Sequence, residues 1–228
     1  MNPGRLRVGL LNQLPPGRTV LHPACRHAVE QAAQLLESLG HMVEQSHPEA
    51  LLEPDEENLV FRLRCAEIAA RVRALSQMTG KPMGPDGIEP STATMVELAQ
   101  RLSALDVFMA LTWIEARSRR IAQWWADGFD LLLTPTTAEP PPLLGTFAAT
   151  AEKPLRGMAR GLPLLVFATA FNQTGQPAIS LPLHWTAEGL PIGIQLVAAY
   201  GREDLLIRTA AQLEQARPWA QRRPPVSA

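Results

Sequence analysis

A short apolar stretch in the second half of the chain constrains the fold more than any other feature. The run Asp130–Thr134 contains three consecutive leucines and is bounded by Gly128 before it and Pro135 after it. Continuous rather than alternating apolar residues over so short a length are typical of a strand buried inside a sheet. We therefore expect a core sheet strand at this position.

The beginning of the chain predicts a strand, a helix and a second strand. Apolar residues alternate over Leu6–Leu10, which indicates a strand, and the following Pro-Pro-Gly cluster ends it. A helix then places Ala28, Ala32, Leu35 and Leu39 on one face, before Gly40. The segment His41–Gln45 indicates another short strand. This order favours a βαβ unit with parallel strands.

The remaining patterns predict further helices and strands. Helical spacing covers residues 53–76 and two later helices, the second introduced by Ser103 and Asp106 as a capping box. Loops rich in Gly and Pro are expected at residues 80–90 and 136–154. Two apolar strands, Ala178–Leu183 and Ile192–Ala198, precede a last helix that starts at Glu203.

The fold class that follows is α/β, with a mixed sheet flanked by helices. We expect one domain over residues 1–228. Its first part, residues 1–127, holds the βαβ-like unit and the long helices. Its second part, residues 128–228, holds sheet strands, pocket loops and the closing helix.

Composition restricts the partners and the location. Hydrophobic residues make up 46% of the 228 positions, which is enough for a real core, and the net charge is −1. A charge so close to zero gives no broad attraction to nucleic acid or to an anionic membrane. No run reaches the length of a membrane span or of a signal-peptide core. A cytoplasmic protein with small molecules or proteins as partners is therefore expected.

Cysteines and histidines offer no metal or cofactor site. Cys25 and Cys65 each fall in a helical pattern without a neighbouring ligand and are interpreted as reduced, structural thiols. His22 and His27 are five residues apart, on different sides of a helix. A Ser180 nucleophile with His184 as base is a further hypothesis, but the sequence shows no third group that would orient the base. Neither a metal nor a cofactor is predicted.

Three segments of the chain nevertheless resemble one known family. They are the runs Phe129–Thr136, Phe171–Pro182 and Gly189–Val197, and a helix ending in Glu214–Trp219 follows them. Their order and spacing are similar to the closing landmarks of amidase signature enzymes. The opening strand at Leu6–Leu10 also resembles the segment after that family's signature region. The resemblance spans nearly the whole chain and is nearest to the hydrolases of nylon oligomers.

The resemblance implies an amide hydrolase whose catalytic groups lie elsewhere. Family members use a serine nucleophile, a second serine in a cis peptide bond and a lysine base, with backbone amides holding the oxyanion. This sequence has no Ser-Ser pair, and its lysines, Lys81 and Lys153, each stand beside a proline. No catalytic residue is therefore assigned, and we expect the chain to be a carboxy-terminal half that is inactive alone.

Substrate-binding residues can be carried over only in part. Thr136, at the end of the leucine-rich strand, and the Phe171–Asn172 turn resemble elements that flank the acyl pocket in relatives. For Asn172 the alternative is a buried amide that only stabilises a local turn. The three candidate site residues are thus Thr136, Phe171 and Asn172.

Two interpretations of function remain open. The chain is either part of a split or fragmentary amidase, active on a small amide when complemented by an amino-terminal half, or a non-catalytic remnant that binds a ligand or a partner chain. Exposed apolar area on one side would indicate the remnant. Poor solubility or self-association is expected, since half of a shared sheet leaves an open edge and an uncovered core face. The substrate itself is not specified by the sequence, because pocket shape determines it.

Overall fold

The computed structural model describes residues 3–14, 19–55, 57–84 and 87–222. The chain divides into two compact units. The first unit comprises Met1–Leu52, Arg120–Pro142 and Pro163–Ala228, and the second comprises Glu53–Arg119 and Leu143–Leu162. The prediction of one domain over residues 1–228 remains a prediction, and the two units are described in turn.

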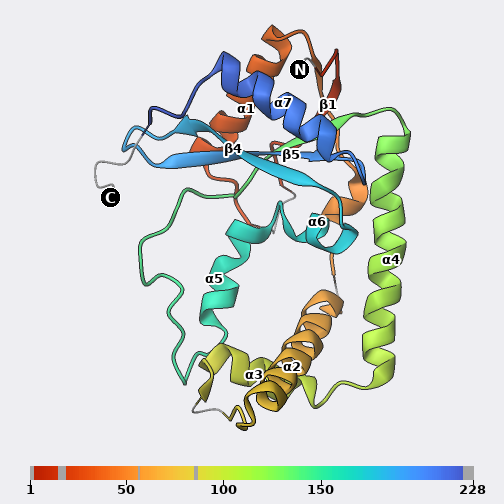
Figure 1. The fold of residues 1–228 in the computed structure, drawn as a ribbon, viewed down its shortest axis with the longest axis vertical. Helices are drawn as coiled ribbons and strands as arrows, with labels where there is room; N and C mark the ends of the chain where they lie inside the picture. Colours follow the sequence, from red (N-terminus) through yellow and green to blue (C-terminus); the bar gives the residue numbers. More distant parts are fainter. Residues whose placement is uncertain (1–2, 15–18, 56, 85–86, 223–228) are drawn as a thin grey trace. The chain divides into compact units, whose positions relative to one another are not determined.

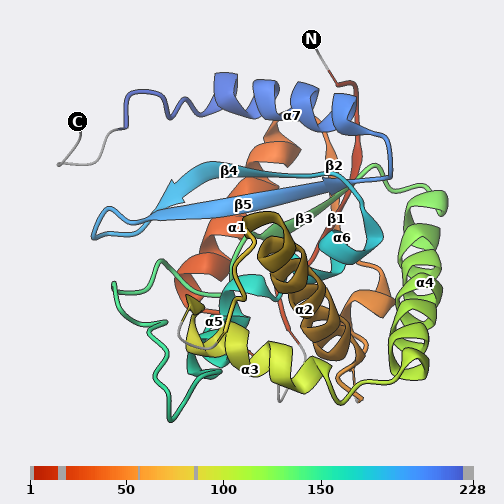
Figure 2. The same cartoon turned by 60° about the horizontal axis from the view of Figure 1, so that its bottom comes forward.

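A five-stranded mixed sheet forms the centre of the first unit (Figures 1 and 2). Its strands lie in the order β2-β1-β3-β5-β4. β1 is parallel to both β2 and β3, whereas β5 is antiparallel to both β3 and β4. The strands are β1 (Arg7–Leu10), β2 (Met42–Gln45), β3 (Leu131–Pro135), β4 (Ala178–Trp185) and β5 (Pro191–Ala198). The predicted mixed α/β sheet is confirmed.

The βαβ unit forms as its sequence pattern predicts. Helix α1 (Pro23–Ser38) starts with a proline in its first turn, and the His22 side chain caps it by accepting a hydrogen bond from the Ala24 amide. Its buried face includes Ala28 and Ala32. Gly40 follows with φ of 93°, a conformation that an L side chain would strain. The chain then enters β2 in parallel with β1.

Both faces of the sheet are covered, as the uninterrupted leucines of β3 require. On one face, Gln31 of α1 hydrogen-bonds His184 of β4. Helix α7 (Glu203–Ala216) also packs against β4 and β5. On the opposite face, Gln195 of β5 hydrogen-bonds the Phe167 carbonyl, which precedes helix α6 (Thr169–Thr174). Every residue of β3 is consequently buried.

Three helical segments build most of the second unit. They are α2 (Leu59–Thr79), α3 (Pro90–Ala99) and the beginning of α4 (Ala104–Ala126). α2 starts six residues later than predicted, because the Asp55 carboxylate accepts hydrogen bonds from the amides of Leu59 at 2.7 Å and Val60 at 2.9 Å. The predicted capping box is confirmed, since Ser103 Oγ accepts from the Asp106 amide and Asp106 accepts from the Ser103 amide.

Two short helices were not predicted. Residues 136–154 contain no helix or strand, as expected, but α5 (Arg156–Leu165) follows them with Pro163 inside it. The predicted turn at Phe171–Asn172 is wrong, because both residues lie within helix α6. A 3₁₀ turn, η1 (Glu49–Leu52), also follows β2.

Within the described ranges, no helix combines the length and apolarity needed to cross a bilayer.

Candidate functional site

The carboxyl ends of three parallel strands, β2, β1 and β3, meet at one edge of the first unit's sheet. In α/β sheets, ligands usually bind outside this edge, because loops rather than packed helices cover it. Leu11 follows β1, η1 follows β2 and Thr136 follows β3. We call this region the carboxyl-edge site.

A small recess lies at the carboxyl-edge site. Its cavity volume is about 10 Å³, room for at most one water molecule. Phe171, which is buried, forms part of its wall, whereas Thr134 contributes the end of β3. The other lining residues are apolar: Leu11, Leu51, Leu52, Val166, Phe167 and Ala170. These residues alone therefore leave no space for a substrate here.

Beside the recess, two hydroxyl groups face each other across the sheet. Thr136 Oγ1 and Ser180 Oγ are 2.6 Å apart, and the Thr136 amide donates to the Gly193 carbonyl at 3.0 Å. A Cβ atom at Gly193 would lie 2.7 Å from each hydroxyl oxygen, so only glycine leaves room for the pair. Thr136 is half-buried and Ser180 is exposed. The pair can exchange hydrogen bonds with a ligand at the surface.

Gln195 anchors the sheet next to this hydroxyl pair. Its side chain is only 5% exposed, and Nε2 donates to Thr134 Oγ1 at 3.1 Å and to the Phe167 carbonyl at 3.0 Å. Both bonds are buried, where a lost partner is costly. Gln195 thus fixes the position of the segment that carries Phe171.

The structure places the three candidate site residues differently. Thr136 and Phe171 both belong to the carboxyl-edge site, one in the hydroxyl pair and one in the recess wall. Asn172 is exposed on α6 and does not line the recess, so the alternative of a buried amide that stabilises a local turn is wrong. Substrate binding by these residues stays a prediction.

Ser180 and His184 do not form a catalytic pair. The register places Ser180 opposite Gln195 and His184 opposite Ile192, with an irregularity between them. Gln195 and Ile192 are three residues apart, so they point to opposite faces of β5. Accordingly, Ser180 bonds Thr136 while His184 Nδ1 lies 3.0 Å from Gln31 Oε1 on α1.

The lysine amines and the cysteine thiols of the chain do not have the environment that a nucleophile needs. Lys81 and Lys153 are both exposed. Burial raises the pKa of Cys25 to about 11 and raises that of Cys65, which keeps both thiols protonated. Both cysteines are buried and free, as the sequence predicts. In the described part of the chain, no three His, Cys, Asp or Glu side chains group as a metal site would need.

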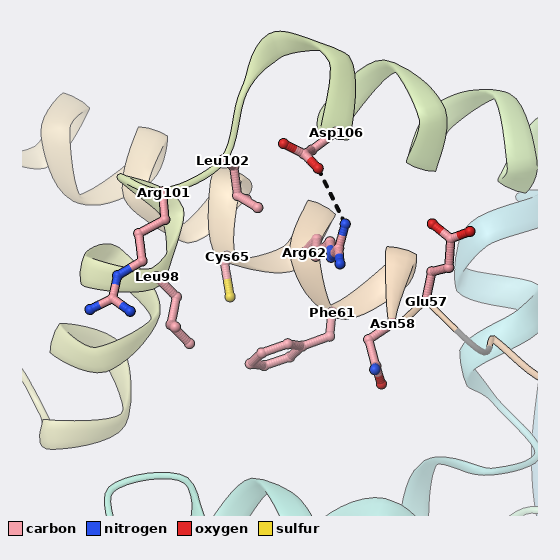
Figure 3. A pocket seen from close by; sticks show the side chains of 9 residues that line it. All are labelled: Glu57, Asn58, Phe61, Arg62, Cys65, Leu98, Arg101, Leu102 and Asp106. Carbon is pink, nitrogen blue, oxygen red and sulfur yellow. Dashed lines mark hydrogen bonds and ion pairs between the residues drawn. The ribbon is translucent and has the colours of Figure 1, made fainter.

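The second unit contains a larger cavity, which we call the α2–α3 pocket (Figure 3). Its volume is about 580 Å³, within the range of ligand pockets. Apolar lining comes from two pairs of residues with i, i+4 spacing: Phe61 and Cys65 on α2, and Leu98 and Leu102 at α3 and just after it. The polar lining consists of Glu57, Asn58, Arg62, Arg101 and Asp106.

Two of the polar residues of this pocket neutralise each other. Arg62 Nη1 lies 3.2 Å from Asp106 Oδ1, and both side chains are partly exposed. Hydrogen bonds from Ser103 are the main cause that lowers the pKa of Asp106. Sequence analysis did not find this pocket. The i, i+4 apolar pairs were its only signal, and they look the same on any packed helix.

Comparison with known proteins gives a consistent family. A family model described as Amidase matches residues 2–207. The 6-aminohexanoate-cyclic-dimer hydrolase of Paenarthrobacter ureafaciens is 37% identical over 98% of this chain and 46% of its own length. A putative amidase, AmiC, of Mycobacterium leprae is 32% identical over 96% of this chain and 46% of its own. The chain thus spans about half the length of these curated relatives.

Solved structures agree with the sequence matches. A structure of 6-aminohexanoate cyclic dimer hydrolase complexed with substrate superposes with a TM-score of 0.92 at 36% identity, covering 99% of this chain and 48% of the other. A bacterial aryl acylamidase of the amidase signature family superposes with a TM-score of 0.75 at 21% identity, covering 95% and 44%. The second match supports the fold alone.

Proposed function

This chain belongs to the amidase family, and we propose that it forms the carboxy-terminal part of an enzyme that hydrolyses the carbon–nitrogen bond of a linear or cyclic amide. The observation that carries the proposal is the match over 99% of the chain, at 36% identity and a TM-score of 0.92, to an amide hydrolase solved with its substrate. Amides built from aminoalkanoic acids are the substrate class, by analogy with the printed name of that relative.

In this proposal the catalytic serines and lysine lie outside residues 1–228. Amide hydrolysis by a serine needs a neutral base within hydrogen-bond reach of the nucleophile. The two lysines are exposed and His184 is on the face opposite Ser180. These positions support a chain that supplies scaffold and substrate contacts rather than the nucleophile.

The carboxyl-edge site contributes the substrate contacts. The exposed Ser180 and the half-buried Thr136 each carry a hydroxyl group, which can both donate to and accept from an amide. Phe171 lies in the wall of the neighbouring recess. Because the recess itself is nearly full, the space for the acyl group would be completed by the amino-terminal segment.

Exposed apolar residues on α4 support a covering segment. Leu105 is 65% exposed and Phe108 is 66% exposed, and Met109 is next to them on the same side of the helix. Large apolar groups rarely gather on a free surface without a partner. The segment that completes the enzyme, or a second copy of this chain, would cover them.

A chimera tests the proposal. The part of the Paenarthrobacter ureafaciens hydrolase that lies outside the match is joined to this chain and assayed for release of amine from the 6-aminohexanoate cyclic dimer and from simple aryl amides. The same part rejoined to the relative's own matched segment through an identical junction is the control. We expect the chain alone to be inactive and the chimera to release amine.

Two outcomes contradict the proposal. One is measured hydrolysis by the chain alone that disappears on a Ser180→Ala change. The other is a folded chimera that is inactive on every amide tested while the control junction is active.

A further inference from the structure

We propose that the α2–α3 pocket binds a linear zwitterion, an ω-amino carboxylate whose two charged ends are separated by an apolar spacer. This site lies wholly within the second unit and requires no catalysis, so it goes beyond the proposed hydrolysis. Three features carry the inference: the apolar lining, an acidic group that bonds no residue in the described part of the chain, and a basic group at the other end of the pocket.

The apolar lining matches a polymethylene spacer. Phe61, Cys65 and Leu98 occupy the middle of the pocket in Figure 3, and Leu102 lies beside them. Cys65 is 1% exposed, and burial raises the pKa of its thiol, so it acts as a small apolar group. A methylene chain laid along this surface gains from the area it removes from water.

An acidic group borders one end of the pocket. Glu57 lies two residues before the start of α2, and its carboxylate makes no hydrogen bond or ion pair with any residue that the structure describes. The adjacent Asn58 has φ of 54°, the left-handed conformation, and its side chain does not cap the helix. Asparagine tolerates this conformation better than most residues. A carboxylate and an amide oxygen are thus both available to an ammonium group.

A basic group borders the opposite end. Figure 3 shows Arg101 on the side of Leu98, away from Glu57, with Phe61 and Cys65 between the two charges. Arg101 pairs only loosely with Glu97, at 3.3 Å with 73% of its side chain exposed, so its other guanidinium donors can bind a carboxylate.

The remaining charges do not favour a singly charged ligand. Arg62 and Asp106 form their own ion pair, and Asp106 also accepts two hydrogen bonds from Ser103. Glu57 and the Arg101 guanidinium nitrogens that do not bond Glu97 are therefore the charged groups left to select a ligand. A ligand with one charge would satisfy one end and leave its other end against a group of the wrong polarity. Opposite charges on a single molecule satisfy both.

Titration calorimetry on the purified chain tests the proposal. The probes are 6-aminohexanoate, with hexanoate and hexylamine as analogues that each lack one charge, and 4-aminobutanoate and 8-aminooctanoate for spacer length. We expect 6-aminohexanoate or one of its length variants to bind about two- to fivefold more tightly than either singly charged analogue, the ratio that a solvated ion pair provides.

Variants of Glu57 and Arg101 test which end of the ligand each residue binds. Glu57→Gln should weaken binding of the zwitterion about two- to fivefold and leave that of hexanoate unchanged, and Arg101→Gln should weaken binding of the zwitterion and of hexanoate but not of hexylamine. The matched control is Arg119→Gln, because Arg119 also forms an exposed i, i+4 pair, with Glu115, but does not line the pocket.

Three results overturn the inference: no binding of any zwitterion, equal affinity for the zwitterion and hexanoate, or an equal effect of Arg119→Gln and Arg101→Gln. Every measurement here is a binding affinity of the chain alone. A negative result can therefore be distinguished from failure of the chimera to hydrolyse an amide.

Discussion

The hydroxyl oxygens of Thr136 and Ser180 lie 2.6 Å apart, although 43 residues separate the two positions in the chain. β5 makes this contact possible, because it lies between β3 and β4 and presents a glycine where the two side chains meet. The same contact joins a residue predicted to bind substrate to one considered as a nucleophile.

Gly193→Ala should destabilise the first unit. The new methyl carbon would lie 2.7 Å from both hydroxyl oxygens and 3.1 Å from Thr136 Cβ, well inside van der Waals contact. We expect a loss of about 1–3 kcal/mol in the free energy of unfolding, as for other overpacked sites. Urea denaturation followed by circular dichroism measures it.

The control for this change is Gly84→Ala, because a Cβ there meets nothing within 4 Å. It should alter stability by less than about 0.5 kcal/mol. In a background carrying Thr136→Ala and Ser180→Ala, the cost of Gly193→Ala should shrink by about 1 kcal/mol. An undiminished cost in that background would show that the hydroxyl pair is not what excludes the methyl group.

Ser180 should resist fluorophosphonate reagents. A serine reacts with them when a base draws its proton, and the only histidine of β4, His184, bonds Gln31 on the other face of the sheet. Intact-mass measurement after prolonged incubation should show unmodified protein. An adduct at Ser180 that is lost on His184→Asn would reverse this conclusion.

Strands with a continuous or alternating apolar pattern could be predicted from the sequence. β3 could be recognised because it is buried on both sides and therefore has consecutive leucines. The β1-α1-β2 order could be recognised because the spacing of apolar residues changes from that of a strand to that of a helix, and Gly40 marks the end of the helix. Helix α5 was missed because Gly157, Gly161 and Pro163 all fall within it and disfavour a helix locally. No residue of α5 is buried, and the Pro163 carbonyl accepts a hydrogen bond from the Ala138 amide, a contact between distant positions that local preference does not include.

The residues of the candidate site also differ in how far the sequence could predict them. Thr136 could be placed because a strand end is a local feature. The exposure of Asn172 depends on the direction of a six-residue helix that looks like a turn in sequence. The α2–α3 pocket could not be predicted, since Cys65, Leu98 and Asp106 come together only when three helical segments meet.

Gln195→Met should lower the free energy of unfolding by more than the loss of one polar group suggests. Methionine fills a similar volume but leaves the buried Phe167 carbonyl without its Nε2 donor and Thr134 Oγ1 without another. We expect a loss of about 1–3 kcal/mol in the free energy of unfolding. Thermal or urea unfolding measures it.

Gln123→Met is the matched control. Gln123 also donates one side-chain hydrogen bond, to Asp127 at 3.1 Å, but on the exposed surface of α4. Its replacement should change stability by less than about 0.5 kcal/mol. Equal losses for the two variants would mean that Gln195 is not an anchor of the α6 segment.

Stability should decline as the pH is lowered from 7.5 to 5.5. Burial, followed by the nearby His27 and Arg217, lowers the pKa of His184 below its ordinary value of 6.5, and burial likewise lowers that of His47. The unfolded chain therefore binds more protons in this interval, so the free energy of unfolding rises with pH. The contribution is complete above the unfolded pKa and is lost as the pH falls through the folded one.

His184→Asn separates the two histidines. Asparagine can keep the donor to Gln31 Oε1, 3.0 Å away in the native structure, while removing the titrating ring. The urea midpoint of this variant should depend less on pH between 5.5 and 7.5 than that of the unmodified chain, and the remaining slope should decrease further when His47→Asn is added. A variant with an unchanged slope would place the pH dependence on groups other than His184, since replacing a ring that binds fewer protons in the folded state must flatten the curve.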